Sequence, residues 1–132
     1  MLKLEIVTPE KKVLDESVDT VTIPTANGEV GILAGHAPLI SALKSGILSY
    51  TVGGRTEKLV ISSGFVEVGN DKVSILADIA ETSSEIDVEN ARLEQTETEK
   101  VLASWGGTEE EFEAELEKLG RAQARLQLAA GK

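Results

Sequence analysis

The sequence lacks cysteine and is poor in histidine and aromatic residues. Its 132 residues include no cysteine, one histidine and only 3% aromatic residues. Without cysteine there is no disulfide framework, no thiolate zinc site and no cysteine nucleophile. The hydrophobic fraction of 41% still supports a core, which must be built mainly from valine, isoleucine and leucine. This length predicts one domain, or one small domain with an appendage.

Basic residues and long apolar runs are also scarce. The chain carries 13 Lys and Arg against 23 Asp and Glu, a formal net charge of −10. Phosphate affinity needs clustered Lys and Arg, so the charge excludes a nucleic-acid partner and favours proteins as partners. No apolar run approaches the roughly 18 residues of a membrane helix, and the N-terminus does not resemble a signal peptide. We therefore expect a soluble, intracellular protein that does not insert into the membrane.

Short alternating segments dominate the first 85 residues. Leu2, Leu4 and Ile6 recur at a spacing of two, as in a half-buried strand. Turn signals follow every eight to twelve residues, a pattern typical of a β-sandwich. Three of these signals predict hairpins, at Asn27-Gly28, at Gly53-Gly54 and at Gly69-Asn70-Asp71. We predict that residues 1–85 form an antiparallel β-sandwich.

The stretch Gly28–Leu48 is the most unusual part of the chain. It holds four glycines, the only histidine and the Ala37-Pro38 bond among small and aliphatic residues. Glycine suits positions where the backbone turns with positive φ, and proline keeps the residue before it out of the helical region. The stretch therefore predicts a shaped loop between strands.

The composition changes near Glu81, and residues 86–132 are rich in Glu, Ala, Leu and Arg. Gly106-Gly107 predicts a break between two helices, each about 18 to 21 residues or roughly 27 to 32 Å long. Ser84 or Asp87 can cap the first helix, and Thr108 with Glu111 forms a capping box for the second. We predict a mixed α and β fold, with an antiparallel two-helix hairpin following the sandwich.

The two helices differ in their apolar faces. The second carries a continuous stripe, comprising Phe112, Leu116, Leu119, Ala122, Leu126 and Ala129. The matching face of the first is polar in its middle, comprising Val88, Ala91, Gln95, Thr98, Leu102 and Trp105. So little apolar surface predicts that the hairpin rests on the sandwich or on a partner. Two interpretations stay open, an arm that exchanges between the two and a static clamp on a sheet edge.

Catalytic and metal-binding patterns are absent. His36 lies between Gly35 and Ala37, and no GxSxG motif accompanies it. One histidine and no cysteine leave only carboxylates as metal ligands, and no spaced Asp loop occurs. The acidic run from Glu109 to Glu117 is most simply a solvated helix face. We predict no catalytic residue, no metal site and no cofactor.

Three segments carry a family resemblance. They are G-E-V-G-I-L-A-G-H-A-P-L-I from Gly28, S-S-G-F-V-E-V from Ser62 and V-S-I-L-A-D from Val73. Together with the opening L-E-I-V-T-P, they resemble the epsilon subunit of the bacterial F-type ATP synthase. The resemblance spans the whole chain. Ala34 stands where the family often has proline, and Ser63 where glycine is common.

The resemblance implies a non-catalytic subunit of the central rotor stalk. Such a subunit binds gamma and the c-ring at the cytoplasmic face of the bacterial membrane. Its helical arm folds down or extends towards the alpha and beta subunits to inhibit ATP hydrolysis. The implied contacts are Gly28, Glu29, Val30, Gly31 and Ile32 with the c-ring, His36 and Ser41 with gamma, and Gly106 and Gly107 as hinge. The alternatives are an ordinary hairpin acid at Glu29 and, for the protein, a free-standing β-sandwich adaptor with a static hairpin.

Some members of the family bind ATP in the folded hairpin. Their motif places an arginine where this chain has Asn90, and a second arginine where it has Glu97. A degenerate nucleotide site remains, comprising Glu81, Asp87, Arg121 and Arg125. Each lost charge-assisted contact is worth roughly 1.5 to 3 kcal/mol, so we predict weak or absent ATP binding.

Overall fold

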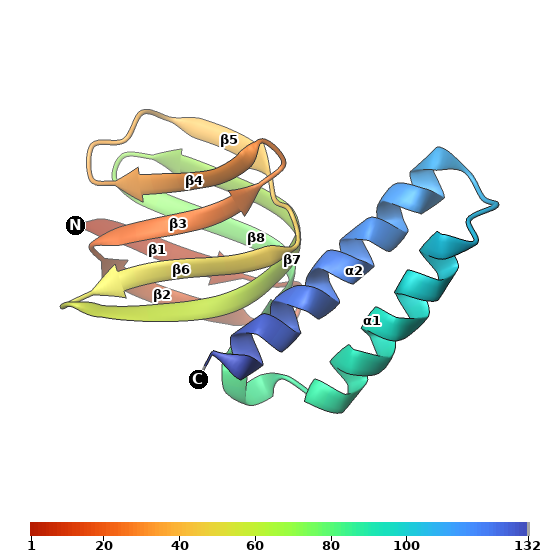
Figure 1. Ribbon diagram of the computed structural model, residues 1–132. Helices are drawn as coiled ribbons and strands as arrows, with labels where there is room; N and C mark the ends of the chain where they lie inside the picture. The colour runs from red at the N-terminus through yellow and green to blue at the C-terminus, as the bar shows by residue number, and fades with distance from the viewer. Residues whose placement is uncertain (132) are drawn as a thin grey trace.

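A computed structural model describes residues 1–131 and shows a β-sandwich followed by a helical hairpin (Figure 1). Both predicted parts of the fold class are confirmed. The strands are β1 (Leu2–Val7), β2 (Lys12–Val18), β3 (Thr20–Thr25), β4 (Gly28–Leu33), β5 (Leu39–Ala42), β6 (Gly46–Val52), β7 (Arg55–Gly69) and β8 (Lys72–Glu81). The short 3-10 helix η1 (Ser83–Glu85) then leads into α1 (Val88–Ala103) and α2 (Glu109–Ala130). The division at residue 85 into two functional units stays a prediction.

The strands follow the order β2-β1-β8-β7-β6-β3-β4, and β5 pairs with β7. All pairs are antiparallel except β1 with β8, which run parallel. Strand β7 belongs to both layers of the sandwich, because one of its edges pairs first with β6 and then with β5. The parallel pair is the one departure from the predicted antiparallel sandwich, and nothing local in β1 or β8 indicates it.

Aliphatic side chains fill the space between the two layers, as the composition predicts. The fully buried ones include Leu2, Leu4, Ile6, Val18, Val21, Ile23, Ile32, Leu48, Ile61, Val66, Val73 and Ile75. Tyr50 is the one aromatic residue of this cluster within residues 1–131. Burial of such side chains contributes roughly 1.5 to 3 kcal/mol each, so the sandwich has a core of its own.

The prediction of a loop between strands for Gly28–Leu48 is wrong. The stretch contains β4, β5 and the start of β6. The hairpin that it opens is confirmed, although Ala26 and Asn27 form its turn, with Thr25 opposite Gly28. Strand pairing uses backbone groups, which glycine also has, so the glycines do not prevent a strand here. The alternation around buried Ile32 therefore determines that Gly28–Leu33 forms a strand.

The sequence pattern predicts two separate strands, over residues 58–61 and 64–68, and the structure joins them in β7. Ser63 and Gly64 have φ of 62° and 120°, yet β7 keeps one register with β8 on both sides of them. A Cβ atom at Gly64 would lie 1.9 Å from the Leu76 carbonyl oxygen. Gly64 thus allows β7 to pass close to β8 while it crosses from one layer to the other.

The predicted caps of the hairpin are confirmed. The Asp87 side chain accepts a hydrogen bond from the Asn90 N–H at the start of α1. Thr108 and Glu111 form the predicted capping box of α2. Helix α1 has 16 residues and α2 has 22, so α1 is slightly shorter and α2 slightly longer than the predicted length of about 18 to 21 residues.

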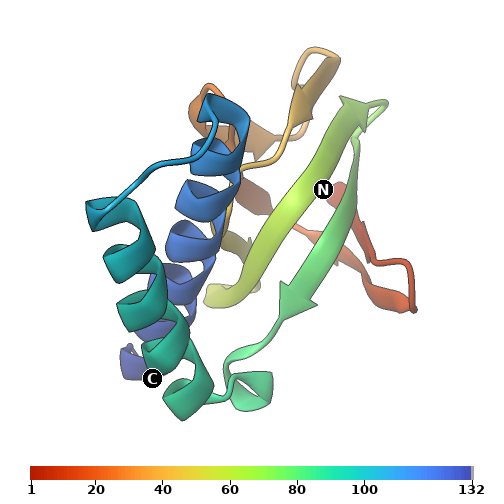
Figure 2. The same ribbon diagram turned by 90° about the vertical axis from the view of Figure 1, so that its right-hand side faces the viewer.

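Helix α2 lies between the sandwich and α1, as Figures 1 and 2 show from two sides. The predicted stripe of α1 is buried or half-buried throughout, whereas Leu116 of the predicted α2 stripe is 44% exposed. Ala124 and Leu128, outside that stripe, are buried against Val60 of β7. The single-stripe prediction is incomplete because α2 packs against two partners on two faces.

Candidate functional site

Metal-binding clusters and membrane-spanning helices are absent from the residues that the structure describes. No three His, Asp or Glu side chains within residues 1–131 gather in an arrangement that could hold a metal ion. Over the same range, neither helix is long and apolar enough to cross a membrane. Exposed side chains and the contacts of the hairpin are the candidate functional features.

An exposed apolar row crosses four neighbouring strands of the sandwich. Ala42 of β5 lies opposite Phe65 of β7, Phe65 opposite Leu76 of β8, and Leu76 opposite Val7 of β1. Phe65 and Leu76 are 60% and 59% exposed, and Ile40, two residues before Ala42, is 73% exposed. Large apolar side chains that are gathered on one face, and not scattered, mark a site of protein interaction. We call Val7, Ile40, Ala42, Phe65 and Leu76 the apolar row.

Two hollows flank the apolar row. One of about 680 Å³ is lined by Ile40, Glu67 and Lys72 among others, and one of about 470 Å³ by Phe65 and Leu76 among others. In the adjacent row, Glu67 of β7, Ser74 of β8 and Glu5 of β1 are polar, and Ile40 of β5 lies opposite Glu67. A hydrogen bond from Lys12, together with the charges of Lys12 and Lys72, lowers the pKa of Glu5, so this carboxyl is ionised at neutral pH.

The two residues predicted to face gamma lie beside the apolar row and outside it. Ser41 is opposite Val66, on the side of β5 that faces the interior, and its hydroxyl donates to the Ala42 carbonyl. His36 lies in the loop before β5, where its Nδ1 is 2.6 Å from the Ala37 carbonyl oxygen. The sequence does contain evidence for the apolar row. In segments where buried and exposed positions alternate, Phe65 and Leu76 are large apolar residues at outward positions.

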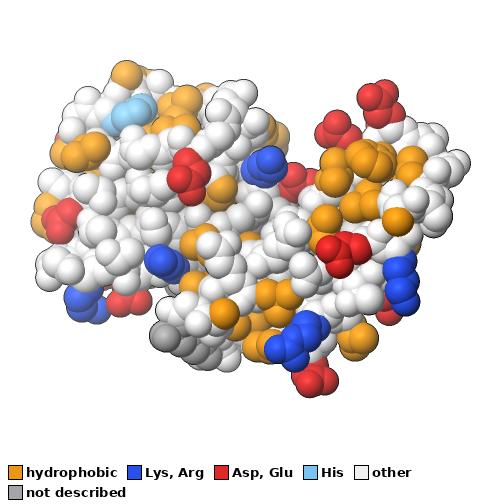
Figure 3. Space-filling view, viewed as in Figure 1, with side chains coloured by type: hydrophobic (Ala, Val, Ile, Leu, Met, Phe, Trp, Pro, Cys, Tyr) orange, Lys and Arg blue, Asp and Glu red, His pale blue; other side chains and the backbone are white. Residues whose placement is uncertain are grey.

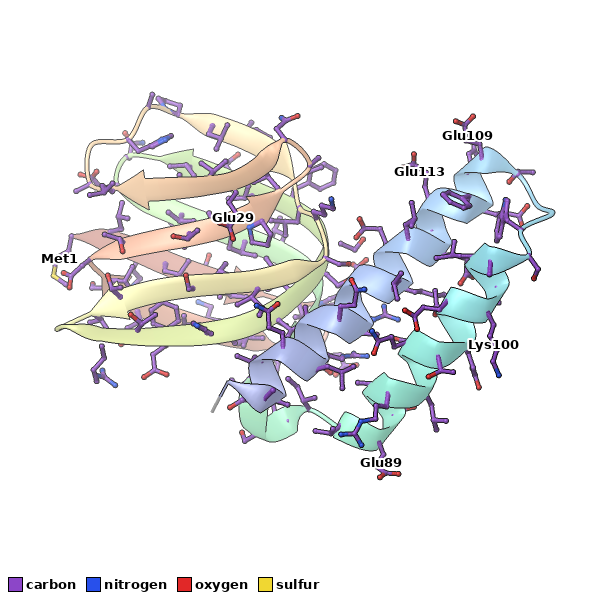
Figure 4. All side chains as sticks on the ribbon, viewed as in Figure 1. Met1, Glu29, Glu89, Lys100, Glu109 and Glu113 are labelled. Carbon is purple, nitrogen blue, oxygen red and sulfur yellow. The ribbon has the colours of Figure 1, made fainter. Side chains whose placement is uncertain are left out.

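The five residues predicted to contact the c-ring belong to β4, which is an edge strand of the sandwich. Glu29 and Gly31 are exposed, whereas Ile32 is fully buried in the core. Figure 4 shows Glu29 on the face of the sandwich that carries β4. Of the predicted side chains, Glu29 is the charged one that a partner can reach, and its role stays a prediction.

The predicted nucleotide residues are partly brought together. Arg125 binds Glu81 of β8 through two hydrogen bonds of 2.7 and 3.2 Å, and it lies 3.6 Å from Glu94 of α1. Arg121 donates to the same Glu94 at 3.1 Å. Asp87 is not part of this cluster, since it caps α1. Glu94 was missed, although its spacing from Ala91 and Thr98 places it on the inner face of α1.

Gly106 and Gly107, the predicted hinge, lie in the connection between α1 and α2. Trp105 packs edge-on against Phe112 there, with ring centres 5.5 Å apart. A Cβ atom at Gly107 would lie 2.9 Å from the Trp105 ring, so glycine makes room for this pair. Figure 3 shows hydrophobic side chains exposed at this tip of the hairpin. A second connection, residues 82–87, joins the hairpin to the sandwich.

Helix α2 binds the sandwich through a short set of contacts. The Glu117 carboxylate accepts hydrogen bonds from the backbone N–H and the hydroxyl of Ser45, at 2.9 and 2.6 Å. The Ser45 hydroxyl also lies 2.7 Å from that of buried Ser62. The apolar part of this contact is small and is centred on Val60, Ala124 and Leu128. The hairpin is therefore docked by a few specific hydrogen bonds and one ion-pair cluster.

An exposed apolar row on a sandwich and a lightly docked helical hairpin are typical of a protein that docks on other proteins. Residues 1–83 match the family described as the beta-sandwich domain of the ATP synthase delta/epsilon chain. An ATP synthase epsilon chain of Desulfitobacterium hafniense is 45% identical over 126 residues, which cover 96% of this chain and 94% of the relative. Another from Carboxydothermus hydrogenoformans is 56% identical over 91 residues, covering 69% and 68%.

Solved structures agree with these relatives. A chain in a cryo-EM structure of the Euglena gracilis mitochondrial ATP synthase superposes with a TM-score of 0.81 and 30% identity, over 98% of this chain and 81% of that one. A chain of the Tetrahymena thermophila enzyme has the same fold at 16% identity and a TM-score of 0.66. The protein belongs to the ATP synthase delta/epsilon chain family and is a non-catalytic subunit of that enzyme complex.

Proposed function

We propose that this chain is a rotor subunit of the central stalk, linking the c-ring to the catalytic head through gamma. The exposed apolar row is the observation that carries the proposal, because it lies on the rigid sandwich and nothing else within residues 1–131 covers it. The rotor operates at the cytoplasmic face of the cell membrane, to which the subunit binds peripherally through the c-ring. The family membership favours this function over a free-standing adaptor.

The apolar row is the docking surface for gamma. An aromatic side chain between flanking hollows suits insertion into a partner, and buried aromatic residues carry much of the energy of an interface. His36 and Ser41 lie close to the row in the chain, and Ile40 and Ala42 supply the side chains that a partner meets. A polar rim that includes Glu5 and Glu67 surrounds it.

Phe65→Glu should weaken gamma binding at least about 100-fold, because it would bury an unpaired carboxylate at the centre of the interface. Affinity for purified gamma is the measurement. Leu33→Glu is the matched control, since Leu33 is 61% exposed on the other layer of the sandwich. Equal losses in both variants, or no loss for Phe65→Glu, would place the gamma site elsewhere.

The hairpin is the regulatory arm, and its docked position against the sandwich is the folded-down one. On release it extends along gamma towards the alpha and beta subunits and inhibits ATP hydrolysis. The small apolar contact with the sandwich supports this role, because few interactions must be broken. When the whole arm moves relative to the sandwich, the backbone of residues 82–87 changes conformation. Gly106 and Gly107 permit the two helices to move relative to each other.

A chain that ends at Glu85 should fold and bind gamma with unchanged affinity, while losing any inhibition of ATP hydrolysis. The main core cluster lies wholly within the sandwich, and the cluster beneath α2 is separate from it. Circular dichroism, gamma affinity and the hydrolysis rate of the assembled enzyme test this together. Aggregation of the shortened chain would mean that the hairpin completes the core, and the mobile arm would be abandoned.

ATP should bind to the isolated subunit weakly or not at all. Asn90 and Glu97 replace the two arginines of the family motif, which costs about 10² to 10⁴ in affinity. Moreover, the remaining Arg121 and Arg125 are already paired with Glu94 and Glu81. Calorimetry is the measurement. Asn90→Arg combined with Glu97→Arg should gain affinity, and a low-micromolar dissociation constant for the unchanged chain would refute the prediction.

A further inference from the structure

The tip of the hairpin carries most of the net negative charge of the chain. Residues 97–117 include eight acidic residues and one basic residue, so seven of the ten net negative charges lie in this segment. Figure 4 shows Glu109 and Glu113 on the side of α2 that is turned away from α1, whereas the basic residue, Lys100, lies on α1. The side of α2 with Glu109 and Glu113 is therefore strongly negative.

Contacts within the chain account for only half of the glutamates in the first part of α2. Three of them bind a cap residue, a lysine or the sandwich, namely Glu111, Glu115 and Glu117. Three are exposed and have side chains without a hydrogen bond or ion pair to any other residue in 1–131, namely Glu109, Glu110 and Glu113. The helix dipole favours acids in the first turn, but Glu113 lies in the second. Glu109 and Glu113 also repel each other, because they are four residues apart.

An exposed apolar stripe lies beside these carboxylates. Phe112 and Leu116 are four residues apart, so they form a stripe of α2 next to that of Glu109 and Glu113. Leu116 is 44% exposed, and Phe112 is half-buried against Trp105. Figure 3 shows hydrophobic and acidic side chains together at this end of the molecule. We call Trp105, Phe112 and Leu116 the tip patch.

The tip patch is accessible while the hairpin is docked. The contacts of α2 with the sandwich involve Glu117, Ala124 and Leu128, which come after the patch in the helix. The N-terminal half of α2 projects beyond the sandwich, as Figure 1 shows. A partner can therefore reach the patch without any movement of the arm.

The chemistry of this surface is complementary to a basic amphipathic helix. Two helices pack through adjoining apolar stripes, and charged residues beside the stripes pair across the interface. Here the charges beside the apolar stripe are all negative on the side of Glu109 and Glu113, so the matching residues are Lys and Arg. A second copy of this chain would bring like charges together, and an anionic membrane surface would repel the tip in the same way.

We propose that the tip patch binds a basic amphipathic helix of a partner protein. The apolar stripe of that helix packs on Phe112 and Leu116, and its Lys or Arg side chains pair with Glu109 and Glu113. This contact does not depend on the proposed docking of gamma, because the apolar row lies on the sandwich and the tip patch on the hairpin.

A synthetic peptide supplies the probe. It is a helix of about 20 residues with a leucine stripe flanked by lysines, long enough to be helical in isolation. Trp105 is the only tryptophan of the chain and belongs to the tip patch, so its fluorescence reports binding. The peptide should bind with micromolar affinity, which should weaken by about tenfold or more between about 0.05 and 0.5 M salt. The same peptide with glutamate in place of lysine should not bind.

Glu109→Gln with Glu113→Gln tests the acidic stripe. This double variant should lower the affinity for the lysine peptide by about tenfold, because two ion pairs are lost. Glu10→Gln with Glu89→Gln is the matched control, since it removes the same charge from exposed residues away from the tip. The control should change the affinity by less than about twofold.

Leu116→Gln tests the apolar stripe. It should lower the affinity by about fivefold or more, because a leucine that the peptide buries is replaced by a polar residue. Leu93→Gln is the matched control, since Leu93 is 60% exposed on α1 and lies outside the tip patch. Both leucines are exposed, so neither change removes a core residue, and circular dichroism should show the same fold.

The occupant is decided by four outcomes. Losses for both tip variants, with neither control affected, support the basic helix as the partner. Equal losses in the tip variants and their controls would show a general attraction to an acidic chain and would overturn the proposal. No change in Trp105 fluorescence with the lysine peptide would also overturn it. So would a dimer of the chain alone in sedimentation that Leu116→Gln abolishes, because the occupant would then be a second copy.

Discussion

The double variant Ser45→Cys with Gly120→Cys should form a disulfide under oxidising conditions and hold the hairpin on the sandwich. A Cβ atom at Gly120 would lie 3.5 Å from the Ser45 Cβ, within the distance that a disulfide needs. The chain has no other cysteine to compete. Closing a loop of this length stabilises a folded protein by about 4 kcal/mol. Unfolding in denaturant, measured with and without reductant, gives the size of the effect.

In the assembled enzyme, the oxidised variant should lose all hairpin-dependent inhibition of ATP hydrolysis, and reduction should restore it. The disulfide keeps α2 away from the alpha and beta subunits, which are the proposed targets of the extended arm. Each single cysteine variant serves as a control, because it carries the same side-chain change without the bond. Inhibition that persists after complete oxidation would show that the arm does not act by extension.

Gly64→Ala should lower the free energy of unfolding by roughly 3 to 5 kcal/mol, a large part of the stability of a small domain. The new methyl group would overlap the Leu76 carbonyl oxygen, and a φ of 120° is strained for any residue with a Cβ. Strands β7 and β8 would have to separate at the point where β7 changes layers. Denaturant titration followed by circular dichroism measures the loss.

Gly69→Ala is the matched control for this second prediction. Gly69 ends the same strand, a Cβ atom there would meet no other atom within 4 Å, and it is not among the glycines with positive φ. Its substitution should change the free energy of unfolding by less than about 1 kcal/mol. Similar losses at both positions would mean that close approach at Gly64 does not determine the structure of β7.

Local patterns in the sequence predicted the parts of the fold that local chemistry determines. The capping box at Thr108 and Glu111, the turn at Gly53-Gly54 and the alternation in β1 each depend on residues close together in the chain. What could not be predicted depends on distant partners. The second buried face of α2, at Ala124 and Leu128, exists only because β7 lies beneath it.

The candidate site also combines features that the local sequence predicted with features that depend on distant parts of the chain. Arg121 and Arg125 at a spacing of four predicted a shared face, and the structure brings both to Glu94. Asp87 carries the same charge as Glu81, but its place at the start of α1 makes it a cap. The apolar row was missed because its members come from four strands, and their neighbourhood follows from strand order alone.

The parallel pairing of β1 with β8 delays completion of the sandwich during synthesis. Residues 3–7 of β1 each pair with a residue 69 positions later, as Val7 does with Leu76. At the usual rates of translation, roughly 3 to 14 s separate the synthesis of the two strands. During that interval the nascent β1–β2 hairpin lacks one neighbour, and Leu4 and Ile6, which are fully buried in the finished sandwich, stay exposed.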